Sequence, residues 1–298
     1  MRVAITGSSG LIGSALAAAL LADGQQVTRL VRRDPPRPGE VRWDPKMAGG
    51  GIAPEALDGV DAVVHLSGAP VAGGLWTQAR KRVLRASRID STTALVSAMA
   101  RAPRPPSVLL SGSAIGWYGD TGDREVDESA PAGTGFLADL VRDWEAAAQP
   151  ARQAGARVAT LRSGIVMSRR GGMLGPLLPA FRLGLGARIG DGRQYISWIS
   201  ITDHVAAVRY LLDHAEIDGP VNLTAPAPVT NAEFTADLAR AVRRPAWLRV
   251  PAPLIRAGLG EMSGELLGSK RVVPRRLLAA GFAFRHPDLA SALTAELR

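Results

Sequence analysis

Three glycines near the start of the chain have the spacing of a loop that holds phosphate groups. Gly7, Gly10 and Gly13 form a G-x-x-G-x-x-G pattern between an apolar run and an alanine-rich stretch. Glycine permits a tight turn at the first position, a close approach of backbone N–H groups to a pyrophosphate at the second, and close packing of helix on strand at the third. We therefore expect a dinucleotide here. The expected contacts are Gly7, Ser9, Gly10, Leu11, Ile12 and Gly13.

The type of dinucleotide is indicated at the end of the next apolar run. An acidic residue there would bind the ribose 2′-OH of NAD, whereas arginine suits the 2′-phosphate of NADP. The sequence is VTRLVRRD, so Arg32 and Arg33 stand at that place and Asp34 comes too late. We expect NADP (NADPH) as the cofactor. The alternative is that both arginines are solvated loop residues.

These residues need a strand before the loop and a helix after it, and the surrounding pattern predicts both. Short apolar runs alternate with longer helical patterns through the first half of the chain, which is typical of a parallel α/β sheet. The strands are expected at residues 3–5, 27–31, 62–66, 108–110 and 158–161, and the helices at 11–21, 77–99 and 136–148.

After residue 161 the composition and hydrophobic pattern of the sequence change. A stretch rich in glycine and proline, residues 162–194, is expected to be a loop with short helical pieces. A short strand at 195–200, a helix at 201–215 capped by Thr202 or Asp203, and a strand at 220–225 follow. The remaining residues are expected to be mostly helical.

The predicted fold class is α/β. It is a Rossmann-like parallel sheet with helices on both faces and a smaller, mostly helical C-terminal substrate lobe. The dinucleotide-binding domain is predicted at 1–165 and 196–223, and the substrate lobe at 166–195 and 224–298.

Composition narrows the classes of function. The chain has 298 residues, 46% of them hydrophobic, and no cysteine, so disulfides and thiolate metal sites are excluded. Its four histidines form no ligand-spaced pair, so we expect no metal. No apolar run is long enough to span a bilayer, and the first residues resemble a strand rather than a signal peptide, so we expect a cytoplasmic protein with no membrane partner. The net charge is +9, but the arginines are spread along the chain, which argues against nucleic acid.

Beyond these patterns, motifs over nearly the whole length resemble one protein family. They include TGSSGLIG, HLSGAP, SRIDST, SGSAIGWYGD, GFLADLVRDWEAAA and GDGRQYISWISITD. The chain resembles the extended short-chain dehydrogenases/reductases, the NAD(P)-dependent epimerases and dehydratases, and within them an atypical group called epimerase family proteins. The resemblance implies a Rossmann-like sheet, an NADP-type cofactor and a C-terminal lobe that builds the substrate pocket.

The resemblance also implies site residues. Ser111 and Ser113 end a strand and are expected near the nicotinamide, with Ser113 at the position of the family's catalytic serine. The alternative is that both serines only cap the strand end. A second segment should lie along the adenine-ribose and pyrophosphate, and its residues are Leu66, Ser67, Gly68 and Ala69.

One part of the family pattern is missing. The family normally uses a Tyr-x-x-x-Lys pair on the helix after Ser113, and none of the three tyrosines has a lysine four residues on. Phe136 and Leu137 stand near the tyrosine position, and apolar groups transfer no protons. Tyr118 is then a candidate proton donor, or else an aromatic anchor for a glycine-rich loop. Residues of the helix that offer charge are Asp139, Arg142 and Glu145.

Two hypotheses remain open from the sequence. The first is an NADP-dependent oxidoreductase or nucleotide-sugar-type epimerase with a non-standard active site that acts on an unidentified small molecule. The second is a non-catalytic NADP(H)-binding sensor or scaffold. The missing Tyr-x-x-x-Lys pair favours the sensor or scaffold. The predicted C-terminal lobe, which could wall a substrate pocket, favours the enzyme. A monomer or a homodimer is expected.

Overall fold

A seven-stranded parallel sheet forms the centre of the protein in the computed structural model, which describes residues 1–34, 36–47 and 51–297. All neighbouring strands of this sheet are parallel. Its strands are, in spatial order, β13 (Gly219–Leu223), β7 (Arg157–Ser163), β5 (Val108–Ala114), β4 (Ala62–His65), β1 (Arg2–Thr6), β2 (Gln26–Val31) and β3 (Glu40–Arg42). The short edge strand β3 was not predicted from the sequence.

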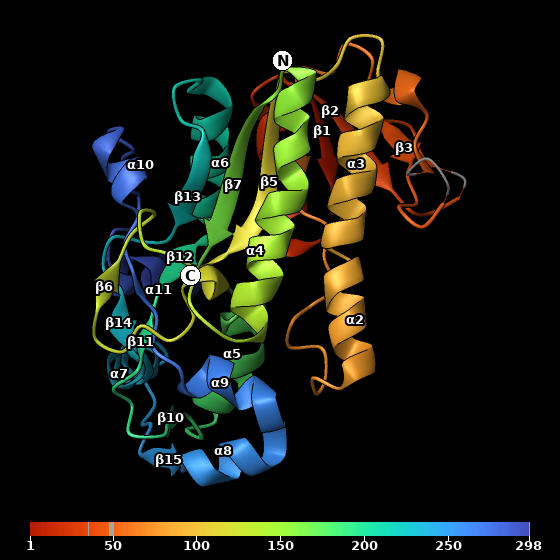
Figure 1. Cartoon of the computed structure of the whole chain (residues 1–298). Helices are drawn as coiled ribbons and strands as arrows, with labels where there is room; N and C mark the ends of the chain where they lie inside the picture. The colour runs from red at the N-terminus through yellow and green to blue at the C-terminus, as the bar shows by residue number, and fades with distance from the viewer. Residues whose placement is uncertain (35, 48–50, 298) are drawn as a thin grey trace.

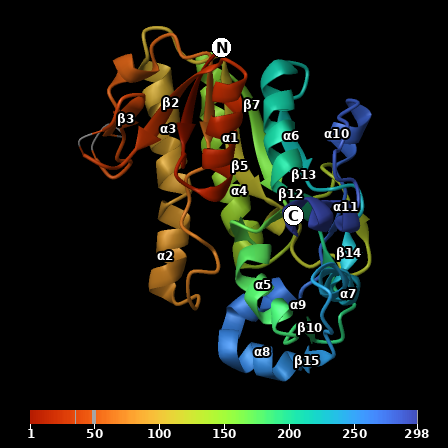
Figure 2. The same cartoon turned by 180° about the vertical axis from the view of Figure 1, so that it is seen from behind.

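Helices cover both faces of the sheet, as predicted. On one face lie α1 (Leu11–Ala22) and α6 (Ile201–Asp213), seen in front of the sheet in Figure 2. On the other lie α3 (Ile89–Arg101) and α4 (Phe136–Ala148), in front in Figure 1. The central strands are almost completely buried because both faces are covered. Two hydrophobic cores result, one on each face.

Two helix predictions were wrong in detail. The single helix expected over 77–99 is broken into α2 (Gln78–Ala86) and α3, because Ser87 and Arg88 turn to bind the segment after β4. The cap of α6 is Ser200, whose Oγ accepts from the Asp203 N–H at 3.0 Å, rather than Thr202 or Asp203. Ser200 precedes the expected helix start at residue 201 by one position, so its hydroxyl can reach a free N–H group of the first turn.

Segments that belong neither to the sheet nor to the helices on its faces form a lobe with its own apolar core. This core includes Trp198, Phe234 and Leu174. The glycine- and proline-rich segment holds more regular structure than expected. The helices of this part are α5 (Leu174–Arg182), α7 (Asn231–Ala241), α8 (Ala252–Leu259), α9 (Ser263–Leu267) and α11 (Leu289–Leu297). A further helix, α10 (Arg275–Ala279), packs instead beside β13, and its Leu277 belongs to a core of the sheet. The short strands are β6 (Glu125–Val126), β8 (Ile165–Ser168), β9 (Gly171–Gly172), β10 (Ala187–Ile189), β11 (Tyr195–Ile196), β12 (Trp198–Ser200), β14 (Val229–Thr230), β15 (Leu248–Val250) and β16 (Arg271–Val272).

The carboxyl ends of the sheet strands point towards this lobe, downwards in Figure 1. Ligands of open α/β sheets bind outside the carboxyl ends of the strands. The arrangement therefore places a candidate site between the sheet and the lobe. Within the described ranges, no helix is long and apolar enough to cross a membrane.

Candidate functional site

The glycine loop, residues 7–13, joins β1 to α1 at the carboxyl edge of the sheet. Gly7 has a φ of +65°, and a Cβ there would lie 2.7 Å from the Leu66 carbonyl oxygen. A Cβ on Gly13 would lie 2.3 Å from the Gly7 carbonyl oxygen, whereas one on Gly10 would lie 3.3 Å from the same atom. Gly7 and Gly13 are thus required by the backbone itself, and Gly10 leaves bare backbone at the loop's tip.

The N-terminus of α1 offers free donors behind this loop. Gly10 is its N-cap, no side chain caps it, and its first turn holds no acidic residue. The first N–H groups of a helix lack intrahelical partners and favour an anion. Leu11 and Ile12, both half-buried, carry two of these groups, and Ser9 is exposed beside them. The residues present therefore fit a pyrophosphate.

The second loop, residues 66–69, follows β4 and packs against the glycine loop. The Leu66 N–H donates to Thr6 Oγ1 at 3.0 Å, and Thr6 Oγ1 lies 2.7 Å from Nδ1 of His65. Burial lowers the pKa of His65 to about 3, so the imidazole is neutral. The pair of side chains fixes where the second loop leaves the sheet, while Ser67 is half-buried and Gly68 is exposed at the loop's tip.

Arg88 is a residue of this region that the sequence did not single out. Its Nη2 donates to the Ala69 carbonyl oxygen at 3.0 Å, and its guanidinium lies over the Trp144 ring. Burial lowers the pKa of Arg88 to about 10, helped by the nearby charge of Arg80. No carboxylate of the described chain pairs with it. This buried cation supports the second loop through the Ala69 carbonyl group.

The two arginines expected at the adenosine end differ in their surroundings. Arg33 forms an ion pair with Glu40 of β3, which holds the pKa of Glu40 near 2. Arg32 is exposed and has no hydrogen bond or ion pair to any described residue. Arg32 is thus the guanidinium that is free to meet a phosphate, and Arg33 is already engaged.

Behind the end of β5, a buried polar network joins this strand to α4, β7, β13 and the turn at Ile115–Tyr118. Ser113 Oγ donates to Glu145 Oε1 at 2.6 Å, and Arg162 binds both oxygens of the same carboxylate at 2.8 and 3.0 Å. Burial acts to lower the pKa of Arg162, but the paired carboxylate outweighs it and the pKa is raised. Ser111 is fully buried within β5, and Ser113 is 5% exposed. The Ser113 hydroxyl is therefore held by a fixed carboxylate.

Tyr118 belongs to the same network. Its hydroxyl donates to Asn222 Oδ1 at 2.7 Å and accepts from Arg162 Nη1 at 3.1 Å. Burial raises the pKa of Tyr118 to about 12. Both sides of the phenol oxygen are occupied, which favours the loop-anchoring hypothesis for this residue.

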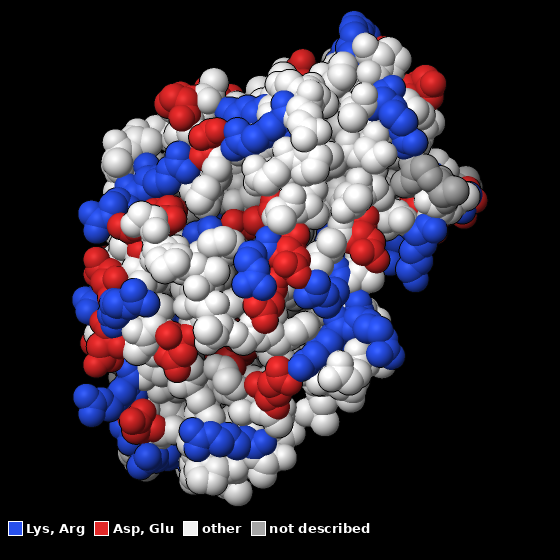
Figure 3. Space-filling view, in the orientation of Figure 1, with Lys and Arg blue, Asp and Glu red and all other residues white. Residues whose placement is uncertain are grey.

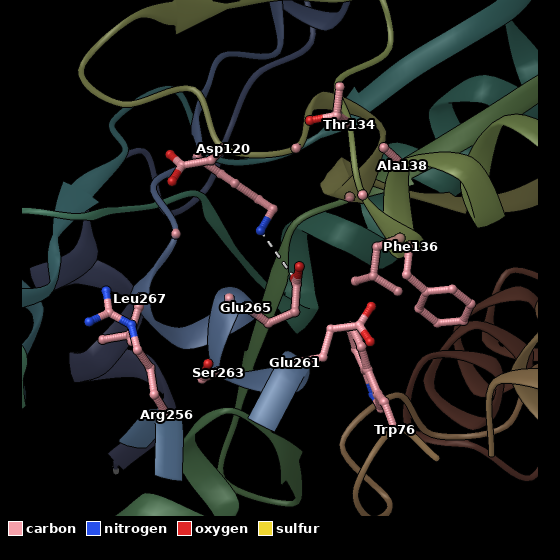
Figure 4. A pocket seen from close by; sticks show the side chains of 17 residues that line it. Trp76, Asp120, Thr134, Phe136, Ala138, Arg256, Glu261, Ser263, Glu265 and Leu267 are labelled. Carbon is pink, nitrogen blue, oxygen red and sulfur yellow. Dashed lines mark hydrogen bonds and ion pairs between the residues drawn. The ribbon is translucent and has the colours of Figure 1, made fainter. Parts of the chain in front are cut away.

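A cavity of about 350 Å³ opens on the other side of the β5–α4 connection (Figure 4). Gly116 and Leu137, the latter near the family's tyrosine position, belong to its lining. Lys270 and Glu265 line it too, with Lys270 Nζ 3.1 Å from Glu265 Oε2. Asp120 also contributes to the lining. The cavity thus contains charged groups at a place where the helix offers none.

The mouth of the cavity is bridged from the sheet side. Trp76 and Phe136 line it and pack edge to face, with ring centroids 5.2 Å apart. Lys81 of α2 lies over the Phe136 ring and forms an ion pair with Glu261 of the lobe. These contacts join the two sides of the cleft across the entrance.

Sequence reasoning missed Lys270, Arg162 and Glu265 as site residues. Lys270 is one of only three lysines, but it is more than a hundred residues from Ser113 in the chain. Arg162 is the second-last residue of β7 and pairs in register with Ser113 of β5. Arg162 lies one residue beyond the strand predicted at 158–161, at the start of the segment expected to be a loop, so nothing local in the sequence pointed to its burial.

Taken together, the sheet order, the glycine loop and the uncapped helix define a dinucleotide-binding protein of the short-chain dehydrogenase/reductase class. The chain belongs to the NAD dependent epimerase/dehydratase family, which it matches over residues 3–223. Residues 250–296 match a domain of unknown function, DUF1731. The resemblance predicted from the motifs is thereby confirmed.

Relatives support the narrower group. The chain is 51% identical to "Epimerase family protein Mb2239" of Mycobacterium bovis over 98% of this chain and 96% of that protein. Its structure is similar to that of the human epimerase family protein SDR39U1 with NADPH, with a TM-score of 0.91, 34% identity and 99% of each chain covered. It also resembles a nucleoside-diphosphate sugar epimerase from Corynebacterium glutamicum, with a TM-score of 0.82 and 37% identity, covering all of this chain and 58% of that one.

Proposed function

We propose that this protein is an NADP(H)-dependent oxidoreductase or epimerase that acts on a small polar molecule held in the cavity. The observation that carries the proposal is that Leu137, near the family's tyrosine position, lines the same cavity as the ion pair of Lys270 with Glu265. The charged pair supplies the proton donor and acceptor that the helix lacks. When bound, NADPH supplies the hydride chemistry.

In this proposal, separate residues bind the cofactor and the substrate. The glycine loop and the α1 N-terminus bind the pyrophosphate, and Arg32 binds the 2′-phosphate. The Lys270 ammonium group donates a hydrogen bond to a substrate oxygen, and Glu265 holds that ammonium in place. Phe136 and Trp76 exclude water at the mouth, which strengthens these polar contacts. The cofactor of the solved human relative supports the choice of NADPH.

The cofactor preference is tested by titration calorimetry with NADPH and NADH. We expect NADPH to bind roughly tenfold more tightly or better, because one charged hydrogen bond to phosphate is at stake. Arg32→Ala should remove most of this preference and Arg33→Ala little of it, since Glu40 already occupies Arg33. Equal affinity of the unmodified protein for both cofactors contradicts the assignment.

The substrate site is tested by a screen that follows NADPH absorbance with small hydroxy and oxo compounds. Lys270→Met should reduce turnover of any substrate found by about a hundredfold, the scale of general acid–base catalysis, with NADPH affinity unchanged. Lys46→Met is the matched control, since Lys46 is an exposed lysine outside the cavity. Full activity of Lys270→Met rules out the proposed role.

A second candidate function rests on the polar network. Because Glu145 and Arg162 occupy the hydroxyls of Ser113 and Tyr118, the protein is alternatively an NADP(H)-binding sensor or scaffold without turnover. This candidate predicts tight NADPH binding with no reaction in the screen. In either case we propose a cytoplasmic protein, monomeric or homodimeric, that does not act on nucleic acid.

A further inference from the structure

The end of the lobe farthest from the sheet carries an unusual group of exposed apolar side chains. Residues 182–189 and 243–259 lie side by side there, since β10 pairs with β15 and a Cβ on Gly184 would contact Pro245. We call these two segments the lobe tip. Its exposed apolar side chains are Leu183 at 75%, Leu185 at 56%, Trp247 at 91%, Leu248 at 49% and Leu254 at 65%.

Trp247 is the extreme member of this group. Trp43, Trp144 and Trp198 are each less than a tenth exposed. Apolar side chains of this size are rarely left in water together on a protein without a partner. The lobe tip therefore has a surface that needs covering.

The charge of the lobe tip identifies what covers it. Its two segments contain no aspartate or glutamate and six arginines, which are Arg182, Arg188, Arg243, Arg244, Arg249 and Arg256. Figure 3 shows blue and white atoms side by side at the lower end of the molecule, where α8 and β15 lie in Figure 1. A partner that matches this tip must be apolar inside and anionic at its surface.

From this pattern we propose that the lobe tip docks onto an anionic lipid bilayer. Leucines enter the acyl region, tryptophan lies at the headgroup level, and arginines meet lipid phosphates. The proposal concerns attachment to a surface, which needs no spanning helix. It replaces, for this one surface, the expectation of no membrane partner, and it does not depend on the proposed catalytic function.

The other occupants fit less well. A second copy docking tip to tip would bring twelve arginines together, and like charges in contact oppose association. A single-stranded nucleic acid would suit the arginines and could stack one base on Trp247, but the four exposed leucines offer no ring for further bases. The bilayer alone satisfies both the leucines and the arginines.

The test is flotation of the full chain with vesicles of phosphatidylcholine, alone or mixed with phosphatidylglycerol. We expect binding only to the mixed vesicles, weakening as salt rises, because the Debye length shortens from about 10 Å at 0.1 M to about 3 Å at 1 M. Emission of Trp247 should shift to shorter wavelength on binding. That shift should vanish in Trp247→Phe, which still binds.

Matched pairs of variants locate the surface. Trp247→Ser with Leu254→Ser, and separately Arg182→Glu with Arg243→Glu, should each weaken vesicle binding by about tenfold or more. The controls are Leu21→Ser with Leu278→Ser, and Arg82→Glu with Arg124→Glu. These controls change other exposed side chains, away from the lobe tip, and should bind like the wild type.

Three results overturn the proposal. One is equal binding of wild type and the tip variants to mixed vesicles. The second is a dimer in sedimentation without lipid that Trp247→Ser dissociates, which would assign the tip to a second copy. The third is tight binding of a single-stranded oligonucleotide that Trp247→Ser abolishes, with no vesicle binding.

Discussion

The two sides of the cleft are built in different ways. The cofactor side is made by the glycine loop and the second loop, two short segments that meet backbone against backbone at Gly7. The substrate side is assembled from side chains of segments more than a hundred residues apart, such as Leu137 and Lys270. A loop that depends on backbone geometry can be recognised from the spacing of its glycines in the sequence. A group of side chains from distant segments comes together only in the folded chain.

The largest expected loss of stability is in the buried network of Arg162 with Glu145. Arg162→Met leaves the Glu145 carboxylate buried without its partner, which should lower the free energy of unfolding by about 3–5 kcal/mol. Urea unfolding followed by circular dichroism measures it. Arg142→Met, at an exposed ion pair with Asp139, should cost less than about 1 kcal/mol. Comparable costs for the two variants would remove the distinction between buried and surface pairs.

Acid should destabilise the sheet part of the molecule through two buried histidines, His65 at the end of β4 and His204 of α6. Burial lowers the pKa of His65 to about 3 and that of His204 to about 4. Above an unfolded pKa of about 6.5 both are neutral in either state and add nothing. As the pH falls below that value only the unfolded chain takes up protons, so each histidine should cost about 1.4 kcal/mol per pH unit until its folded pKa is reached.

The measurement is urea unfolding of the wild type and of His65→Asn and His204→Asn between pH 7 and pH 5, in steps of one unit or less. In each variant, the free energy of unfolding should fall less steeply as the pH decreases, by about 1.4 kcal/mol per pH unit below the unfolded pKa of histidine. An unaltered slope in both variants would show that carboxylates alone set the acid response.

The backbone side should be most sensitive at Gly13. Gly13→Ala places a Cβ against the Gly7 carbonyl group and should lower the free energy of unfolding by about 1–3 kcal/mol while abolishing NADPH binding. Gly10→Ala, whose Cβ lies farther from that oxygen, should cost less than about 1 kcal/mol and weaken NADPH by steric contact alone. Calorimetric titration and thermal unfolding of the pair distinguish the roles, and equal losses of stability would contradict the geometry.

The smallest effect on turnover is expected at Tyr118. Tyr118→Phe keeps the ring and removes two hydrogen bonds, which should cost about 1–2 kcal/mol of stability. If the phenol only anchors its loop, turnover in the NADPH screen stays at the wild-type level. A hundredfold loss of turnover with intact stability would instead place Tyr118 among the catalytic residues.

This contrast also explains how far the sequence could lead. α1 and α4 were predicted to within a residue, and the glycine loop was predicted in full, because turn glycines and apolar periodicity are local signals. The break at Ser87 and Arg88 was missed because its cause is a contact with Ala69, eighteen and nineteen residues away in the chain. Lys270 was missed for the same reason on a larger scale. The engagement of Arg33 by Glu40 depends on β3, a strand of three residues with no periodicity to detect.

The ion pair of Lys81 with Glu261 across the mouth of the cavity has a consequence for rates. Any molecule entering or leaving the cavity passes contacts that are partly electrostatic and partly aromatic. Salt weakens the electrostatic part and leaves the ring contact of Trp76 with Phe136 in place. Exchange of a bound molecule should therefore quicken with ionic strength up to a plateau, and Lys81→Met should exchange at the plateau rate in any salt.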